Sequence, residues 1–280
     1  SLQAFGKSLV AATLSLANIF FYSQAGYFDS PSLLKPLLHT WSLAVEEQFY
    51  LFLPLLLFLI FKYARKYVVP ILGAVLLLSL AGSVYSMQAD PGGAFYLAHL
   101  RAWELLIGGL IALRPLRIKP WLYQVLSLLG LVVVLLSAML YSENTVFPGL
   151  AALLPVLGTA AIINAGVSQR TWVGSLLSTR PMVLIGKISY SLYLWHWPLL
   201  VFAKYYAIIG LTPLNSLLWW LASFGFAFLS WKFIETPFRQ ARFMRRRIFL
   251  GSAAVAGVIL AGALTMVLSG GLPQRYDFAR

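Results

Sequence analysis

The segment WLYQVLSLLGLVVVLLSAML (Trp121–Leu140) contains no charged side chain. A membrane-spanning helix needs about 20 mainly apolar residues, because its rise must cross about 30 Å of hydrocarbon. In lipid, the backbone polar groups must also be paired within the segment itself, which favours a helix over irregular structure. The segment therefore predicts a transmembrane helix.

Eight other segments are also mainly apolar, so we predict an all-α, polytopic transmembrane helical bundle with about nine spans. The predicted spans are residues 5–22, 41–61, 68–86, 95–113, 121–140, 148–164, 183–208, 214–232 and 248–268. The composition agrees, since 60% of residues are hydrophobic and 10% are charged, against about 45–50% and about 25% in a soluble domain. We expect a transmembrane domain over residues 1–269 and an external linker tail over 270–280.

The net charge of +13 raises the question of nucleic-acid binding. The basic residues lie in short loops between apolar segments, which is typical of topology signals, and no nucleic-acid partner is expected. The alternate loops carry only Lys35 as a basic residue. The alternate loops also carry the acids Asp29, Asp90 and Glu143. The basic residues of the other four loops are Lys62, Arg65, Lys66, Arg114, Arg117, Lys119, Arg170, Arg180, Arg239, Arg242, Arg245, Arg246 and Arg247. This bias predicts a cytoplasmic N-terminus and an external C-terminus.

Several classes of function have no support in the sequence. Cysteine is absent, which excludes disulfides, thiolate metal sites and a cysteine nucleophile. The three histidines show no paired spacing, so no metal is expected. Neither G-x-S-x-G nor G-x-G-x-x-G occurs, and soluble hydrolase and dinucleotide-binding interpretations therefore have no basis.

Three ionisable residues, His99, Arg101 and Glu104, interrupt the predicted span 95–113. An arginine at the centre of a span costs about 2.5–3.5 kcal/mol, so charged residues here indicate a functional site by default. Arg101 and Glu104 are three residues apart and can pair on one helix face. The alternative interpretation is a purely structural ion pair within the bundle.

Glu46 and Glu47 lie in the early turns of the predicted span 41–61. Acids are favoured at a helix N-terminus by the helix dipole, and this is the structural interpretation of the pair. It explains poorly why polar residues continue into the apolar stretch. Adjacent residues diverge on a helix, so we expect only one of the two acids, Glu46, to face a site.

His196 lies near the middle of the predicted span 183–208, beside Pro198. The proline removes a backbone donor and frees the carbonyl of Leu194. A histidine at such a kink can accept a proton, although a neutral histidine bonded to a neighbouring helix is the alternative. We expect Glu46, Arg101 and His196 to line one water-accessible cavity, which would suit acyl transfer to a hydroxyl or a proton-coupled transporter.

Four segments in order carry a resemblance to a known family: LLHTWSLAVEEQFY (Leu37–Tyr50), RAWELLIGG (Arg101–Gly109), IGKISYSLYLWHWP (Ile185–Pro198) and FIETPFR (Phe233–Arg239). They resemble the membrane acyltransferase-3 family, the O-acetyltransferases of bacterial surface polysaccharides. The likeness covers nearly the whole chain.

The resemblance implies an enzyme of the bacterial inner membrane that moves an acyl group, usually acetyl, from acetyl-CoA. The implied acceptor is a hydroxyl of a lipid-linked or exported polysaccharide or lipopolysaccharide of the cell envelope, and membrane lipids surround the protein. The family pattern implies catalytic roles for Glu46, Arg101, Glu104 and His196. We expect substrate-binding roles for Tyr190, which the family pattern also includes, and for Trp41.

The chain departs from the family pattern at its start, because family members begin with further helices that carry a histidine thought to be catalytic. We therefore expect an N-terminally truncated member. The tail Gly271–Arg275 resembles a linker that leads, in some members, to an external SGNH-type domain, and we expect no such domain within these 280 residues. Two alternatives remain, namely a glycan-lipid transporter or flippase without covalent chemistry, and a non-catalytic membrane scaffold.

Overall fold

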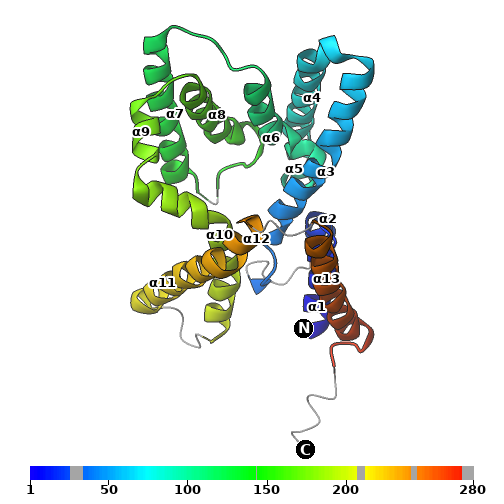
Figure 1. Cartoon of the computed structure of the whole chain (residues 1–280). Coiled ribbons are helices and arrows are strands. Elements are labelled where there is room, and N and C mark those ends of the chain that lie inside the picture. The colour runs from blue at the N-terminus through cyan, green and yellow to red at the C-terminus, as the bar shows by residue number, and fades with distance from the viewer. Residues whose placement is uncertain (26–33, 143, 207–211, 241–244, 273–280) are drawn as a thin grey trace, which may run out of the picture. The chain divides into compact units, whose positions relative to one another are not determined.

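The computed structural model describes residues 1–25, 34–142, 144–206, 212–240 and 245–272 (Figure 1). The chain forms two compact units: the first comprises Ser1–Ala44 and Leu184–Arg280, and the second comprises Val45–Val183. Parts of the sequence predictions lie outside the described residues, namely Asp29, Glu143, Arg242 and the external tail from residue 273 onward.

The second unit consists of helices, three of which share an apolar core. The buried core residues Ile60, Leu72 and Leu106 come from three different helices. The elements of this unit are α3 (Thr40–Tyr63, which begins in the first unit), η2 (Arg65–Tyr67), α4 (Val68–Ala89), α5 (Pro91–Tyr96), α6 (Ala98–Leu113), α7 (Pro120–Leu140), η3 (Gly149–Ala152), α8 (Leu153–Ser168) and α9 (Trp172–Leu177).

The first unit combines both ends of the described chain. Helices α1 and α13 lie side by side (Figure 1), because a glycine, Gly6, lets the backbone of α1 approach Ala263. The elements of this unit are α1 (Leu2–Thr13), α2 (Ala17–Ser23), α10 (Arg180–Tyr206, which begins in the second unit), α11 (Pro213–Ser230), the π-helical turn η4 (Trp231–Glu235), α12 (Thr236–Gln240) and α13 (Arg245–Leu268).

Seven helical segments in the described residues are long and apolar enough to cross a membrane. They correspond to seven of the nine predicted spans and make the chain a multi-pass membrane protein. One of them, Gly149–Ser168, contains Pro155 in the first turn of α8. A backbone N–H in the first turn has no carbonyl partner within its helix, so proline is tolerated at this position.

The predicted spans 5–22 and 183–208 are not among these seven segments. The first is interrupted where Ser15 adopts a φ of 57°, so it forms the short helices α1 and α2 instead of one long helix. The second does form one long helix, α10, but Lys187, Lys204 and its polar side chains lower the apolar character of the segment.

Helices α7 and α8 cross at a pair of glycines. A Cβ added to Gly130 would lie 2.5 Å from the carbonyl oxygen of Gly158, and a Cβ on Gly158 would lie 2.8 Å from the carbonyl oxygen of Gly130. Small residues commonly permit close approach of membrane helices.

This crossing predicts that a glycine-to-alanine substitution lowers the stability of the protein at the crossing but not at a glycine with free space around it. Gly130→Ala should lower the free energy of unfolding by about 1–3 kcal/mol, because the new methyl group meets backbone. Gly73→Ala in α4, where a Cβ would meet nothing within 4 Å, should be neutral or stabilising by up to about 1 kcal/mol through helix propensity. Thermal unfolding of both variants in the same detergent measures this, and equal shifts would show that the crossing is loose.

Candidate functional site

Arg101 and Glu104 form the ion pair that their spacing predicts. The Nε of Arg101 donates to Glu104 Oε1 at 2.9 Å, and Nη2 donates to Oε2 at 2.7 Å. The exposed fractions of the two side chains are 13% and 17%. A bidentate pair fixes the plane of the guanidinium as well as its position, so Glu104 holds Arg101 in one orientation.

Two aromatic rings flank the guanidinium within the second unit. The Cζ of Arg101 lies 5.8 Å from the centre of the Phe95 ring and 5.9 Å from that of Phe147. Cation–π contacts at this distance are attractive. Phe95 belongs to the short helix α5, whose first turn is capped by the Asp90 side chain accepting from the Gly93 backbone. Phe147 lies beyond α7, so its position beside Arg101 depends on the tertiary fold.

A buried serine fixes helix α6, which carries the ion pair. Ser79 of α4 donates its hydroxyl to the carbonyl of His99 at 2.6 Å and accepts from the backbone nitrogen of Trp103 at 3.1 Å. The Trp103 side chain is fully buried. These contacts lie two residues before and two residues after Arg101 in sequence, so they hold the backbone that presents its side chain.

Glu46 and Glu47 face different directions on α3, as expected for neighbours on a helix. Glu46 is half-buried and Glu47 is exposed. Ser42 and Glu46 are four residues apart on this helix, so they share one of its faces. Glu46 is not at the very start of α3, which begins at Thr40.

In the first unit, three rings come together across the chain; we call His39, Ser42, Tyr193 and His196 the histidine cluster. The ring centres of His39 and His196 are 6.0 Å apart, and each lies 5.4 Å from the centre of the Tyr193 ring. The Tyr193 hydroxyl donates to the His39 carbonyl at 2.6 Å, and Ser42 Oγ is hydrogen-bonded to the same hydroxyl. His196 is therefore part of a cluster of polar residues.

Further side chains of α10 bind the turn that precedes α3. Trp197 Nε1 donates to the carbonyl of Lys35 at 2.8 Å, and the Tyr205 hydroxyl donates to the carbonyl of Leu34 at 3.0 Å. Together with the bond from Tyr193 to His39, these contacts hold residues 34–39 against one side of α10. This docking is what places His39 beside His196.

The imidazole of His39, which precedes the candidate span Thr40–Tyr63, is buried and neutral at pH 7. Burial, followed by the proximity of His196, lowers the pKa of His39 from 6.5 to about 4. The carbonyls of Leu194 and Pro36 act in the opposite direction. Pro198 leaves the Leu194 carbonyl without its usual helix donor, so this acceptor remains available to the cluster.

The low pKa of His39 predicts acid sensitivity. Between about pH 6.5 and pH 4 the unfolded chain binds a proton at this residue that the folded chain does not bind. Stability should therefore fall as the pH falls through this range, by about 3 kcal/mol in total. His39→Phe removes the titrating group, so its thermal unfolding temperature should decline less than that of the wild type between pH 7.5 and pH 4.5. Parallel declines would show that His39 does not contribute.

The other predicted site residues lie on the same helices as these groups. Trp41 lies in the first turn of α3, and Tyr190 lies on α10 with half of its side chain exposed. Arg101, Glu104 and Glu46 belong to the second unit, whereas His196, Trp41 and Tyr190 belong to the first. The expected convergence of Glu46, Arg101 and His196 in one cavity stays a prediction.

Two residues with close contacts were not among the predicted site residues. His39 opens the motif HTWSLAVEEQFY, and Glu235 lies in FIETPFR. These two motifs were the sequence signals by which the two residues could have been identified. Glu235 Oε2 accepts from the Ser191 hydroxyl at 2.9 Å, which connects η4 to α10. Its Oε1 lies 3.1 Å from Nη2 of Arg239, an ion-pair distance without hydrogen-bond geometry. π-helical turns such as η4 are frequent at functional sites.

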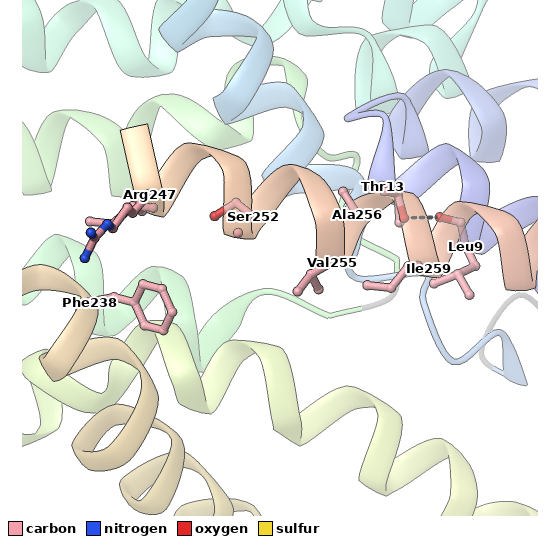
Figure 2. Close-up of a pocket in the computed structure, with 11 residues that line it drawn as sticks. Leu9, Thr13, Phe238, Arg247, Ser252, Val255, Ala256 and Ile259 are labelled. Carbon is pink, nitrogen blue, oxygen red and sulfur yellow. Dashed lines mark hydrogen bonds between the residues drawn. The ribbon is translucent and has the colours of Figure 1, made fainter. Parts of the chain in front are cut away.

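A cavity of about 850 Å³ lies in the first unit between α1, α12 and α13. Figure 2 shows its wall, in which the Thr13 hydroxyl donates to the Leu9 carbonyl and Arg247 stands at one end near Phe238. The remaining lining is mostly apolar, and none of the predicted site residues belongs to it. A second cavity of about 630 Å³ includes Lys35, whose Nζ donates to Gln24 Oε1.

Comparisons with known proteins agree with the motifs. The family model described as an acyltransferase domain, acyltransferase-3, matches residues 8–234. The chain is 29% identical to O-acetyltransferase OatA of Staphylococcus aureus strain NCTC 8325 over 252 residues, which cover 85% of this chain and 42% of that protein. It is 30% identical to a protein of S. aureus strain COL named "Putative O-acetyltransferase", over 83% of this chain and 41% of that protein.

The chain thus spans about two-fifths of the length of the curated relatives that it matches. No solved structure matches it. The family match extends over most of the chain and includes the α6 ion pair and the histidine cluster. The chain therefore belongs to the acyltransferase-3 family, as a multi-pass membrane member.

Proposed function

We propose that the protein is an integral-membrane O-acetyltransferase that moves an acetyl group from acetyl-CoA to a hydroxyl group of a cell-envelope glycan. The observation that carries this proposal is the Arg101–Glu104 pair, a guanidinium held in one orientation within the candidate membrane span Pro91–Leu113. A charge in such a segment is costly and is usually retained for function. The relatives named as O-acetyltransferases support the same class of reaction.

The proposed reaction requires two kinds of group. The acceptor oxygen attacks the thioester carbonyl, negative charge develops on the carbonyl oxygen, the hydroxyl proton passes to a base, and the CoA thiolate leaves. Arg101 would stabilise the developing charge or the phosphates of the donor, and Glu104 would hold the Arg101 guanidinium in the required orientation. His196 would handle the proton, Glu46 would orient or exchange protons, and Trp41 and Tyr190 would contact substrate.

The proposed setting is the bacterial inner membrane, with the donor on the cytoplasmic side and the glycan on the outer side. The basic loops support a cytoplasmic N-terminus and an external C-terminus. The proposed partner in transfer is an external SGNH-type domain. The relatives are longer than this chain, and their additional length is sufficient for such a domain.

Incorporation of label tests the proposal directly. Inverted membrane vesicles that contain the full-length protein would receive acetyl-CoA labelled in the acetyl group, and the glycan would be analysed for ester-linked label released by mild base. We expect incorporation that depends on the full-length gene. Movement of glycan without incorporation of label would identify a transporter and contradict the proposal.

A further inference from the structure

Both ring nitrogens of His39 lack a hydrogen-bond partner among the described residues. The residue is only 6% exposed, so bulk water does not compensate. Buried polar groups in proteins are nearly always hydrogen-bonded, and an unpaired one lowers stability. Such a group in a native protein calls for a partner, and the part of the chain that the structure describes does not supply one.

The chemistry of that partner follows from the groups around the ring. A neutral imidazole has one N–H donor and one lone-pair acceptor. The backbone groups that influence His39 are the carbonyls of Leu194 and Pro36. Both are acceptors, so neither of them can serve the lone-pair nitrogen, which needs a donor.

The two hydroxyl groups of the cluster do not supply that donor. Tyr193 has one hydroxyl proton, and it is directed to the His39 carbonyl at 2.6 Å. The Ser42 proton is then directed either to the Tyr193 oxygen or to the same carbonyl. No described residue therefore supplies the donor that the His39 ring lacks, and a hydroxyl group of a bound ligand would supply it.

His196 presents a second lone pair in the same cluster. Its Nδ1 faces two acceptors, the carbonyls of Tyr193 at 2.8 Å and Leu192 at 3.2 Å. Nδ1 consequently carries the proton, and Nε2 is the lone-pair nitrogen. No described residue is hydrogen-bonded to this Nε2, and its ring centre lies 6.0 Å from that of His39.

We propose that His39 and His196 form a hydroxyl-binding site, in which the lone-pair nitrogen of His39 accepts a hydrogen bond from the hydroxyl group of the acyl acceptor. The assignment rests on the proposed acyltransferase function for the identity of the ligand. Because its pKa is about 4, His39 holds the hydroxyl without removing its proton near neutral pH. His39 is thus a binding residue, and His196 is the neighbouring candidate for proton transfer.

Steady-state kinetics of the full-length protein in lipid nanodiscs test this, with acetyl-CoA as donor and N-acetylglucosamine as the acceptor probe. His39→Phe retains an aromatic ring of similar size and removes the acceptor atom. We expect the KM for N-acetylglucosamine to rise about tenfold, as for the loss of one hydrogen bond to substrate, with an unchanged KM for acetyl-CoA. His39→Gln, which retains an acceptor oxygen, should recover part of the loss.

The matched control is His99→Phe. His99 is exposed, and its backbone carbonyl, which the substitution retains, accepts the hydrogen bond from Ser79, so all kinetic parameters should stay at the wild-type value. An unchanged KM for N-acetylglucosamine in His39→Phe would overturn the proposal. Slower hydrolysis of acetyl-CoA with an unchanged acceptor KM would also overturn it, because the site would then hold water alone.

A direct measurement separates this inference from the proposed function. In protein labelled with ¹⁵N at histidine, the His39 ring signals are assigned by their loss in His39→Gln. Addition of N-acetylglucosamine should shift the signal of the lone-pair nitrogen, whether or not acetyl transfer occurs. No shift at saturating sugar would contradict the binding site, whereas a shift without any transfer by the wild type would contradict only the proposed function.

Discussion

Replacing Arg101 by methionine is expected to lower acetyl transfer by about 10²–10³-fold, the usual effect of removing one charge-stabilising donor from an active site. The guanidinium is held by two bonds to Glu104 and flanked by two aromatic rings, so methionine can fill the space without supplying the charge. The measurement is incorporation of labelled acetyl at matched protein level. Arg114→Met, at the exposed end of the same helix, is the control and should retain activity.

A second variant separates catalysis from structure. Removing one partner of a buried pair leaves the other charge uncompensated, whereas replacing both by apolar residues is often neutral or stabilising. Arg101→Met combined with Glu104→Met should therefore unfold at or above the wild-type temperature and still lack activity. Wild-type activity in this double variant would show that the pair serves only to hold the bundle together.

Replacing His196 by asparagine is expected to lower acetyl transfer by about 10²–10⁴-fold, the range for loss of a general acid or base. The asparagine amide can still donate to the carbonyls of Tyr193 and Leu192, as Nδ1 of His196 does. It has no atom at the place of Nε2. The variant should therefore unfold near the wild-type temperature while losing activity, measured by the same acetyl incorporation.

The comparison for this prediction is His196→Gln, whose longer amide reaches the position of Nε2 but not that of Nδ1. A base at Nε2 is lost in both variants, so both should be inactive. An asparagine variant with full activity would remove Nε2 from the mechanism and leave His196 a structural residue. His99→Gln again serves as the unaffected histidine substitution.

The span predictions differ in outcome for local reasons. Segments such as Pro120–Leu140 are apolar throughout, and lipid then leaves the helix as the available structure. The predicted span 5–22 is apolar as well, yet Ser15 at a φ of 57° divides it. The φ of Ser15 is a local backbone conformation, and a run of hydrophobic residues does not encode it.

The sequence by itself determined the helical class, seven segments that are long and apolar enough to cross a membrane, and the Arg101–Glu104 pair, because each depends on the residues within one helix. Only the tertiary structure brought His39 beside His196 and Phe147 beside Arg101. The two histidines are separated by more than half the chain, and their proximity depends on the bonds that hold residues 34–39 against α10. Contacts of this kind arise from the packing of distant segments, which the periodicity of a single segment does not specify.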